Sequence, residues 1–181
     1  LGDVVCGGFA VPLRNEYADA VILVTSGEFM AMYAANNIMR GLLNFDNGRP
    51  RLLGIVLNCR GVEGERETVE RFARATCTEV IATIPRARLF ADAESKGHTV
   101  MELYPDSAIA DQVRGIADRI AAASDGEDVM SFPHPLDDDQ LSDLAAGREI
   151  RPSSGSVPQR TGCGTCRRSS IKDARVMSSC A

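Results

Sequence analysis

Short apolar runs alternate with longer amphipathic segments along most of the chain. Residues 20–25, 51–58 and 80–84 are short, largely apolar runs, as expected of strands buried on both faces of a sheet. Apolar side chains recur at helical spacing in residues 28–45, 65–75 and 107–123, and Ser26 is a candidate N-cap for the first of these helices. The alternation predicts an α/β fold with a parallel sheet, helices on both of its faces, and ligands at the carboxyl ends of the strands.

This pattern weakens beyond residue 124. Residues 125–151 are acidic and less periodic, with a short helix expected at 136–146. Residues 152–181 are rich in Ser, Gly, Arg and Cys and contain few large apolar side chains. We therefore expect a folded domain over residues 1–124, an acidic extension over 125–151, and a disordered tail over 152–181 that buries little surface.

Composition narrows the class of protein. The 181 residues are 44% hydrophobic, which is enough for one sizeable core, and the formal charge of -5 offers no reason to expect a nucleic-acid partner. No apolar run is long enough to predict a membrane span. Six unevenly spaced cysteines are unlike the disulfide framework of a small secreted domain, so we expect a soluble protein of the reducing cytoplasm.

Cys6 is the first candidate for chemistry. It lies between Asp3 and the pair Gly7 and Gly8, whose lack of side chains lets backbone N–H groups approach a large ligand. An iron-sulfur cluster needs such an approach and a deprotonated thiolate. A small buried cysteine at a strand end is the alternative, and local sequence leaves both open.

Two long motifs carry a family resemblance. They are Gly2-Asp3-Val4-Val5-Cys6-Gly7-Gly8-Phe9-Ala10 and Thr25-Ser26-Gly27-Glu28-Phe29-Met30-Ala31-Met32-Tyr33-Ala34-Ala35-Asn36-Asn37-Ile38. Both resemble the nitrogenase iron protein (dinitrogenase reductase) family. Shorter similarities follow at Leu57-Asn58-Cys59-Arg60, Ile84-Pro85-Arg86, Thr99-Val100, Tyr104-Pro105 and Phe132-Pro133-His134-Pro135, so that the resemblance covers roughly residues 1–148.

The resemblance implies an oxidoreductase with coupled ATP hydrolysis that serves nitrogen fixation. Members of this family have a P-loop nucleotide fold, of which residues 1–124 would be the C-terminal part. They are homodimers that hold one 4Fe-4S cluster between two subunits, use MgATP, and pass electrons to a nitrogenase molybdenum-iron-type partner protein. A ferredoxin or flavodoxin would be the electron donor.

The resemblance also implies roles for individual residues. Cys6 matches a cluster ligand, and Asp3 belongs to the segment that couples nucleotide state to cluster position. Asn58 and the pair Pro85 and Arg86 match the nucleotide-base region of the family. Arg14 matches a position that docks the partner protein. Without the resemblance, an ordinary strand-end aspartate, turn residues and a solvated arginine are the competing interpretations.

The sequence also departs from the family pattern. Residues 87–91, Ile109 and Val113 are largely small or apolar where polar groups tend to surround the base, so base contacts are expected to differ. The chain holds no Gly-x-x-x-x-Gly-Lys-Ser/Thr loop, and the second cluster cysteine of the family lies before residue 1. We therefore expect a C-terminal portion of a longer protein, which would not hydrolyse ATP alone.

Two further questions stay open at this level. Cys163 and Cys166 form a Cys-x-x-Cys pair, with Cys180 beyond it, which is either part of a metal or redox site or an accessory tail. The alternatives for the whole protein are a nitrogenase-like reductase that serves a tetrapyrrole or other non-nitrogenase partner, and a truncated non-catalytic binding protein.

Overall fold

A parallel sheet of three strands is the centre of the fold. The computed structural model describes residues 13, 18–45, 48–126 and 129–150. The strands β1 (Val21–Thr25), β2 (Leu52–Asn58) and β3 (Val80–Ile84) lie in the order β1-β2-β3, which confirms the predicted strands and their parallel arrangement. The middle strand is buried from Leu52 to Leu57, as its continuous apolar run predicts.

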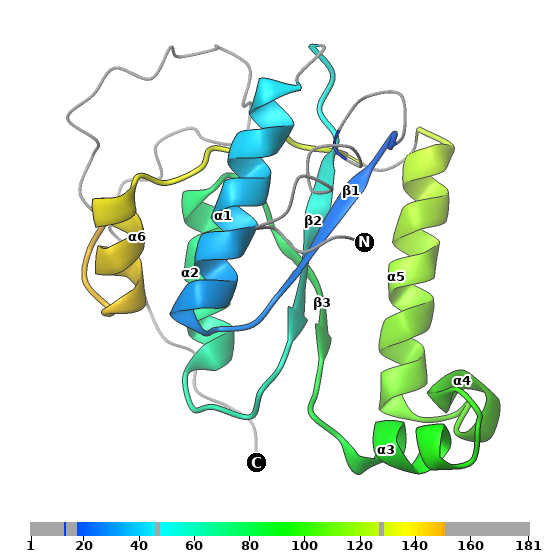
Figure 1. Ribbon diagram of the computed structural model, residues 1–181. Coiled ribbons are helices and arrows are strands. Elements are labelled where there is room, and N and C mark those ends of the chain that lie inside the picture. Colours follow the sequence, from blue (N-terminus) through cyan, green and yellow to red (C-terminus); the bar gives the residue numbers. More distant parts are fainter. Residues whose placement is uncertain (1–12, 14–17, 46–47, 127–128, 151–181) are drawn as a thin grey trace, which may run out of the picture.

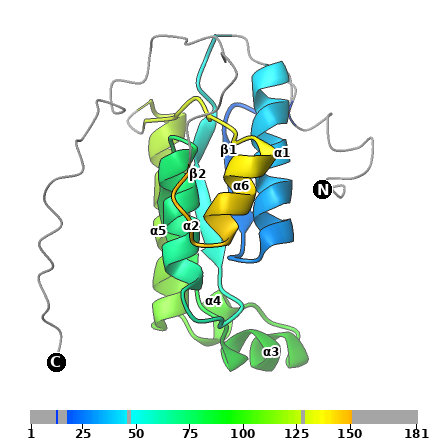
Figure 2. The same cartoon turned by 90° about the vertical axis from the view of Figure 1, so that its left-hand side faces the viewer.

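Helices cover the sheet on both sides (Figure 1). The helices α1 (Phe29–Asn44) and α2 (Glu65–Ala75) lie on one face, whereas α5 (Ala108–Ser124) packs beside β3 on the other. Figure 2 shows α5 behind α2 and the sheet, which confirms that these helices belong to opposite layers. No helix in the described ranges is long and apolar enough to cross a membrane.

The main core lies between the sheet and the layer of α1 and α2. Ile55 and Leu57 of β2 meet Met32 and Met39 of α1, while Phe72 of α2 is fully buried. Burial of each such side chain contributes about 1.5–3 kcal/mol, so this cluster is a major source of stability.

The segment after α5 returns to α1 and α2. Leu52 and Ser131 form an antiparallel bridge, and α6 (Asp138–Ala145) packs against α1 and α2. Side chains of this segment complete the main core, namely Leu136, Leu141 and Leu144. The helix expected at 136–146 is therefore confirmed, and it begins with a capping box between Asp137 and Gln140.

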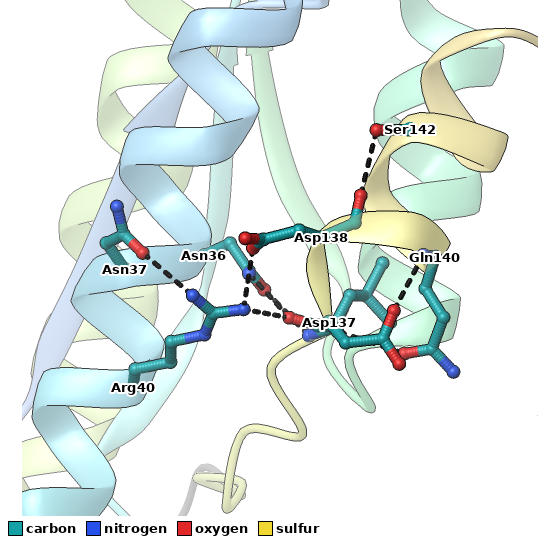
Figure 3. Close-up of polar contacts among 8 residues, drawn as sticks. Asn36, Asn37, Arg40, Asp137, Asp138, Gln140 and Ser142 are labelled. Carbon is teal, nitrogen blue, oxygen red and sulfur yellow. Dashed lines mark hydrogen bonds and ion pairs between the residues drawn. The ribbon is translucent and has the colours of Figure 1, made fainter. Parts of the chain in front are cut away.

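Polar contacts fix α6 to α1 (Figure 3). The side chain of Asn36 donates to the carbonyl of Leu136 at 2.9 Å and accepts from its N–H at 2.8 Å. Arg40, one turn later on α1, reaches the same carbonyl at 2.7 Å and Asp138 at 3.2 Å. The extension is thus joined to the first half of the fold by groups about a hundred residues apart.

Two short helices were not expected from the pattern. The helices α3 (Arg88–Ser95) and α4 (Val100–Leu103) follow β3 and form a second small core around Ala93, Val100 and Ile109. A capping box between Thr99 and Glu102 begins α4, and its Thr-x-x-Glu spacing is a signal that could have predicted the helix. The four residues of α4 are too few for hydrophobic periodicity to reveal this helix.

The predicted N-cap of α1 is wrong. The helix begins after Glu28, and its N-cap makes no side-chain capping hydrogen bond. Ser26 instead donates from Oγ to the carboxylate of Glu28 at 3.1 Å. The reason is that Ser26 lies two residues before the cap, so its hydroxyl is satisfied by the side chain of the cap residue.

Candidate functional site

The carboxyl ends of the three strands meet at one edge of the sheet. Asn58, the last residue of β2, pairs in register with Ile84, the last residue of β3. Asn58, Pro85 and Arg86 are exposed there. Ligands of parallel α/β proteins bind at this edge, so the structure brings together the three residues that match the nucleotide-base region.

Backbone contacts hold the loops after β2 and β3 side by side. The N–H of Cys59 donates to the carbonyl of Ile84 at 2.9 Å. The guanidinium of Arg86 reaches the carbonyl of Arg60 at 3.5 Å, at the limit of a hydrogen bond. The first contact therefore sets the distance between the two loops, and the second adds little.

Glu65 ties the loop after β1 to the loop after β2. Its side chain is buried at the start of α2, with 6% of the residue surface exposed. One carboxylate oxygen accepts from the N–H of Gly27 at 3.2 Å, and both oxygens lie 2.9 Å from the N–H of Arg60. The N–H of Gly61 donates to the second oxygen at 3.2 Å. A single carboxylate thus organises backbone from two strand ends.

This network favours the ionised form of Glu65. Burial by itself raises the pKa of the carboxyl, but hydrogen bonds donated by the backbone of Arg60, Gly27, Gly61 and Val62 together outweigh it and hold the pKa below its ordinary value. The position in the first turn of α2 favours a negative charge as well. Glu65 is therefore a charged, hydrogen-bonded structural acceptor at neutral pH.

Gly27 can approach Glu65 only because it has no side chain. A Cβ built on Gly27 would lie 2.7 Å from Cγ and 3.1 Å from Cα of Glu65. Real Cβ atoms essentially never lie that close to a neighbour. The glycine in the Thr25-Ser26-Gly27-Glu28 motif is thereby explained by the geometry of this loop.

A second, weaker link joins the same loops at the surface. Glu28 forms an ion pair with Arg60 at 3.5 Å and accepts from Ser26 through the same oxygen. Both charged side chains are about 57% exposed, so the ion pair contributes well under 1 kcal/mol. Glu65 accounts for most of the coupling between the loops.

Cys59 lies at this edge but is not activated. Burial raises the pKa of its thiol, the nearby charge of Glu65 raises it further, and Arg66 only partly opposes them. A protonated thiol is a poor nucleophile and a poor metal ligand. Cys59 instead packs against the main core.

Two of the positions at which base contacts are expected to differ, Ile109 and Val113, lie on α5. Ile109 is 3% exposed and packs in the second core, so it does not face a ligand. Val113, one turn later on α5, is 36% exposed. The side-chain oxygen of Gln112, on the same helix, accepts from the N–H of Thr83 in β3 at 3.2 Å.

Other predicted site residues lie outside the described residues. They are Asp3, Cys6, Arg14 and the tail cysteines Cys163, Cys166 and Cys180. Within the described ranges, no three His, Cys, Asp or Glu side chains gather in a way that could hold a metal ion. The cluster ligand therefore has to be argued from the sequence motif around Cys6.

Sequence reasoning did not identify Glu65. A glutamate in the first turn of a helix is common because of the helix dipole, and Glu67 has the same local signature. Gly64, which adopts a left-handed φ of 73° just before α2, marks the turn but not the partners of Glu65. What distinguishes Glu65 from Glu67 is the set of backbone N–H groups that it accepts from, namely that of Gly27, 38 residues away, and those of Arg60 and Gly61.

Comparison with known proteins covers most of the chain. The family model described as "4Fe-4S iron sulfur cluster binding proteins, NifH/frxC family" matches residues 1–151. "Nitrogenase iron protein 2" of Methanothermobacter thermautotrophicus is 41% identical over 144 residues, which are 80% of this chain and 52% of that protein. "Nitrogenase iron protein 2" of Methanobacterium ivanovii is 43% identical over 147 residues, 81% of this chain and 53% of that protein. The chain spans about half the length of these curated relatives.

Proposed function

This chain belongs to the NifH/frxC family of 4Fe-4S iron sulfur cluster binding proteins, and we propose that the protein it represents is an ATP-dependent dinitrogenase reductase. In this proposal, electrons pass from a 4Fe-4S cluster to a nitrogenase catalytic partner. The observation that carries the proposal is the family match over residues 1–151, which includes the motif around Cys6, together with relatives named nitrogenase iron protein.

Cys6 would hold the cluster. A thiolate followed by Gly7 and Gly8 suits a group whose sulfides accept hydrogen bonds from nearby backbone. In a homodimer, Cys6 from each subunit would supply one ligand to a shared cluster. When bound, the cluster supplies a one-electron carrier, and the protein sets its potential through hydrogen bonds and solvent exposure.

MgATP would bind near the carboxyl ends of the strands. An asparagine side chain presents both a donor and an acceptor to an adenine edge, which suits the exposed Asn58, with Pro85 and Arg86 beside it. Asp3 would sense the γ-phosphate, and it lies only three residues before Cys6. A movement of Asp3 would therefore displace the cluster ligand.

Glu65 supports this coupling between loops. Because its carboxylate holds Gly27, Arg60 and Gly61 together, the loop after β1 and the loop next to Asn58 would move as one unit. A displacement of Asn58 by a bound nucleotide would then also displace the start of α1.

The partners follow from the same family membership. We propose a nitrogenase molybdenum-iron-type protein as the electron acceptor, a ferredoxin or flavodoxin as the donor, and Arg14 as a contact to the acceptor. The cytoplasm is the proposed location. Electrons and MgATP would be supplied to the protein there in a reducing environment, which suits its cysteine content.

Iron content tests the cluster assignment. The full-length gene product is expressed without oxygen, and iron per dimer is counted in the wild type, in Cys6→Ala, and in Cys77→Ser as a matched control. Cys77 follows the opposite end of α2 from Glu65, so its loss should leave iron unchanged. We expect Cys6→Ala to lose the iron. Unchanged iron content in Cys6→Ala would overturn the ligand assignment.

Electron transfer tests the partner. The same protein, reduced and supplied with MgATP, is mixed with a purified molybdenum-iron-type partner, and ATP hydrolysis and partner reduction are followed together. We expect both, and we expect neither without the nucleotide. Cluster binding without transfer to this partner would favour a nitrogenase-like reductase with a different acceptor, while absence of both iron and hydrolysis would favour a non-catalytic binding protein.

A further inference from the structure

Cys77 and His134 come together at the far end of α2 from the strand loops. Cys77 follows the last turn of the helix, and His134 belongs to the segment between α5 and α6. The Sγ atom of Cys77 lies 3.1 Å from Nδ1 of His134, although 57 residues separate them. Neither residue has a part in the proposed electron transfer.

The position of His134 is fixed by its backbone. Its N–H donates to the carbonyl of Thr76 at 2.9 Å, and Thr76 is itself fully buried. Pro133 and Pro135 flank the histidine; Pro133 is buried, and a residue before proline is restricted to extended conformations. The imidazole is therefore held next to Cys77 by rigid chain on both sides.

Cys77 occupies a backbone position that normally favours glycine. Its N–H donates to the carbonyl of Arg74, and the N–H of Thr78 donates to that of Ala73, which is the Schellman arrangement at a helix end. The φ angle of Cys77 is 57°, and it is the one non-glycine residue with positive φ in the part of the chain that the structure describes. A side chain is retained here despite a cost of about 1–2 kcal/mol.

The two groups suit thiol chemistry. The imidazole Nδ1 can accept the thiol proton, which is the pairing that activates cysteine nucleophiles. His134 is exposed and Cys77 is partly exposed, so a small reagent can reach the sulfur.

A metal site fits these residues less well. Among the described residues, no group of three or more His, Cys, Asp or Glu side chains could hold a metal ion. Zinc takes four ligands in structural sites and three protein ligands in catalytic ones. Cys77 and His134 supply only two ligands, so a reaction at the Cys77 sulfur suits them better than metal binding.

We propose that Cys77 and His134 form a thiol–disulfide exchange site for a small disulfide. The Cys77 sulfur attacks one sulfur of the disulfide as its proton passes to Nδ1 of His134. The bond between the two sulfurs of the reagent breaks, and a new bond joins Cys77 to one half. The other half leaves as a thiolate and takes the proton from His134, so that one disulfide is consumed and one mixed disulfide and one thiol are formed.

Site-resolved labelling of the full chain tests this proposal. The reagent is glutathione disulfide, and peptide mass spectrometry gives the rate at each cysteine. We expect Cys77 to react about tenfold or more faster than Cys59, whose thiol pKa is raised. Equal rates at Cys77 and Cys59 in the wild type would overturn the proposal.

Variants of His134 distinguish a role as proton acceptor from a role in packing. His134→Asn keeps an acceptor near Nδ1 but no base, and should slow Cys77 by about tenfold while the rate at Cys59 stays the same. His98→Asn, a change at the other histidine of the chain, should have no effect. In His134→Ala, added imidazole should restore part of the rate. Loss of rate without such rescue would assign His134 to packing and contradict the exchange mechanism.

The labelling experiment also reports folding. Unfolding of a His134 variant would expose Cys59 and accelerate its reaction, so a raised Cys59 rate identifies that case. In that case, the reaction rates of Cys77 and Cys59 in the folded wild type decide whether the exchange proposal holds, because their comparison needs no substitution.

Discussion

The side-chain amide of Asn36 forms two hydrogen bonds with the backbone of Leu136, one as donor and one as acceptor. The distances are 2.9 and 2.8 Å, and Asn36 is fully buried between α1 and the segment before α6. An amide can satisfy a carbonyl and an N–H of the same residue at once, because its nitrogen donates and its oxygen accepts. Asn36 therefore fixes the segment before α6 to α1, together with Arg40 and the apolar core contacts of Leu136, Leu141 and Leu144 (Figure 3).

Asn36→Ala should destabilise the protein by roughly 2–4 kcal/mol. It leaves the backbone of Leu136 short of the two partners that Asn36 supplies, and it opens a cavity. Asn37→Ala is the control, because Asn37 is partly exposed and makes one weak contact to Arg40 at 3.4 Å. Urea unfolding measures the stability of both variants. Similar losses of stability would mean that the two hydrogen bonds between Asn36 and Leu136 are unimportant.

Glu65→Gln should destabilise the protein by roughly 2 kcal/mol. The amide has one acceptor oxygen instead of two and turns a donor group toward N–H donors such as that of Arg60. Glu67→Gln, an exposed change in the same turn of α2, should alter stability by less than about 0.5 kcal/mol. Equal unfolding midpoints for the two variants would contradict the assigned role.

Acid should remove the difference between the wild type and Glu65→Gln. The pKa of Glu65 is lowered in the folded state, so its charge stabilises the fold fully above the unfolded value of about 4.3. This contribution is lost as the pH falls through the lower folded pKa, where the side chain becomes neutral like glutamine. Unfolding curves at stepped pH check this, and a gap that stays constant into strong acid would refute it.

Gly27→Ala should destabilise the protein by roughly 1–3 kcal/mol, because its Cβ would lie 2.7 Å from Cγ of Glu65. Gly115→Ala provides the matched control. Gly115 lies inside α5 with nothing near a built Cβ, so alanine should stabilise by about 0.5–1 kcal/mol. Thermal or urea unfolding should therefore show changes of opposite sign at the two glycines.

Cys77→Gly should be more stable than Cys77→Ala by about 1 kcal/mol. Both variants lose the contact with His134, but only glycine adopts a φ of 57° without crowding of Cβ. The difference in unfolding free energy between the two variants therefore measures the cost of a side chain in the left-handed backbone conformation. Equal stability of Cys77→Ala and Cys77→Gly would mean that residue 77 does not adopt the left-handed conformation in the folded protein.

Much of the fold follows from the chain's local pattern. Continuous apolar runs predicted β1, β2 and β3, and periodic apolar positions predicted α1, α2 and α5, because strand and helix register depend on neighbours a few residues away. The four residues of α4 are too few to show a helical repeat, and α3 was not predicted although it has as many residues as α6. Asn58, Pro85 and Arg86 were found through motif similarity, and the strand ends then place them at one edge.

Residue types and their spacing were thus enough to predict an α/β sheet and to identify the family motif around Cys6. Glu65 and Gly27 are 38 residues apart, Cys77 and His134 are 57 apart, and Asn36 and Leu136 are 100 apart. No local preference distinguishes Glu65 from Glu67, or Asn36 from Asn37. These contacts exist because burial of apolar faces brings distant loops together, and a buried polar group must then find its partner wherever packing has placed one.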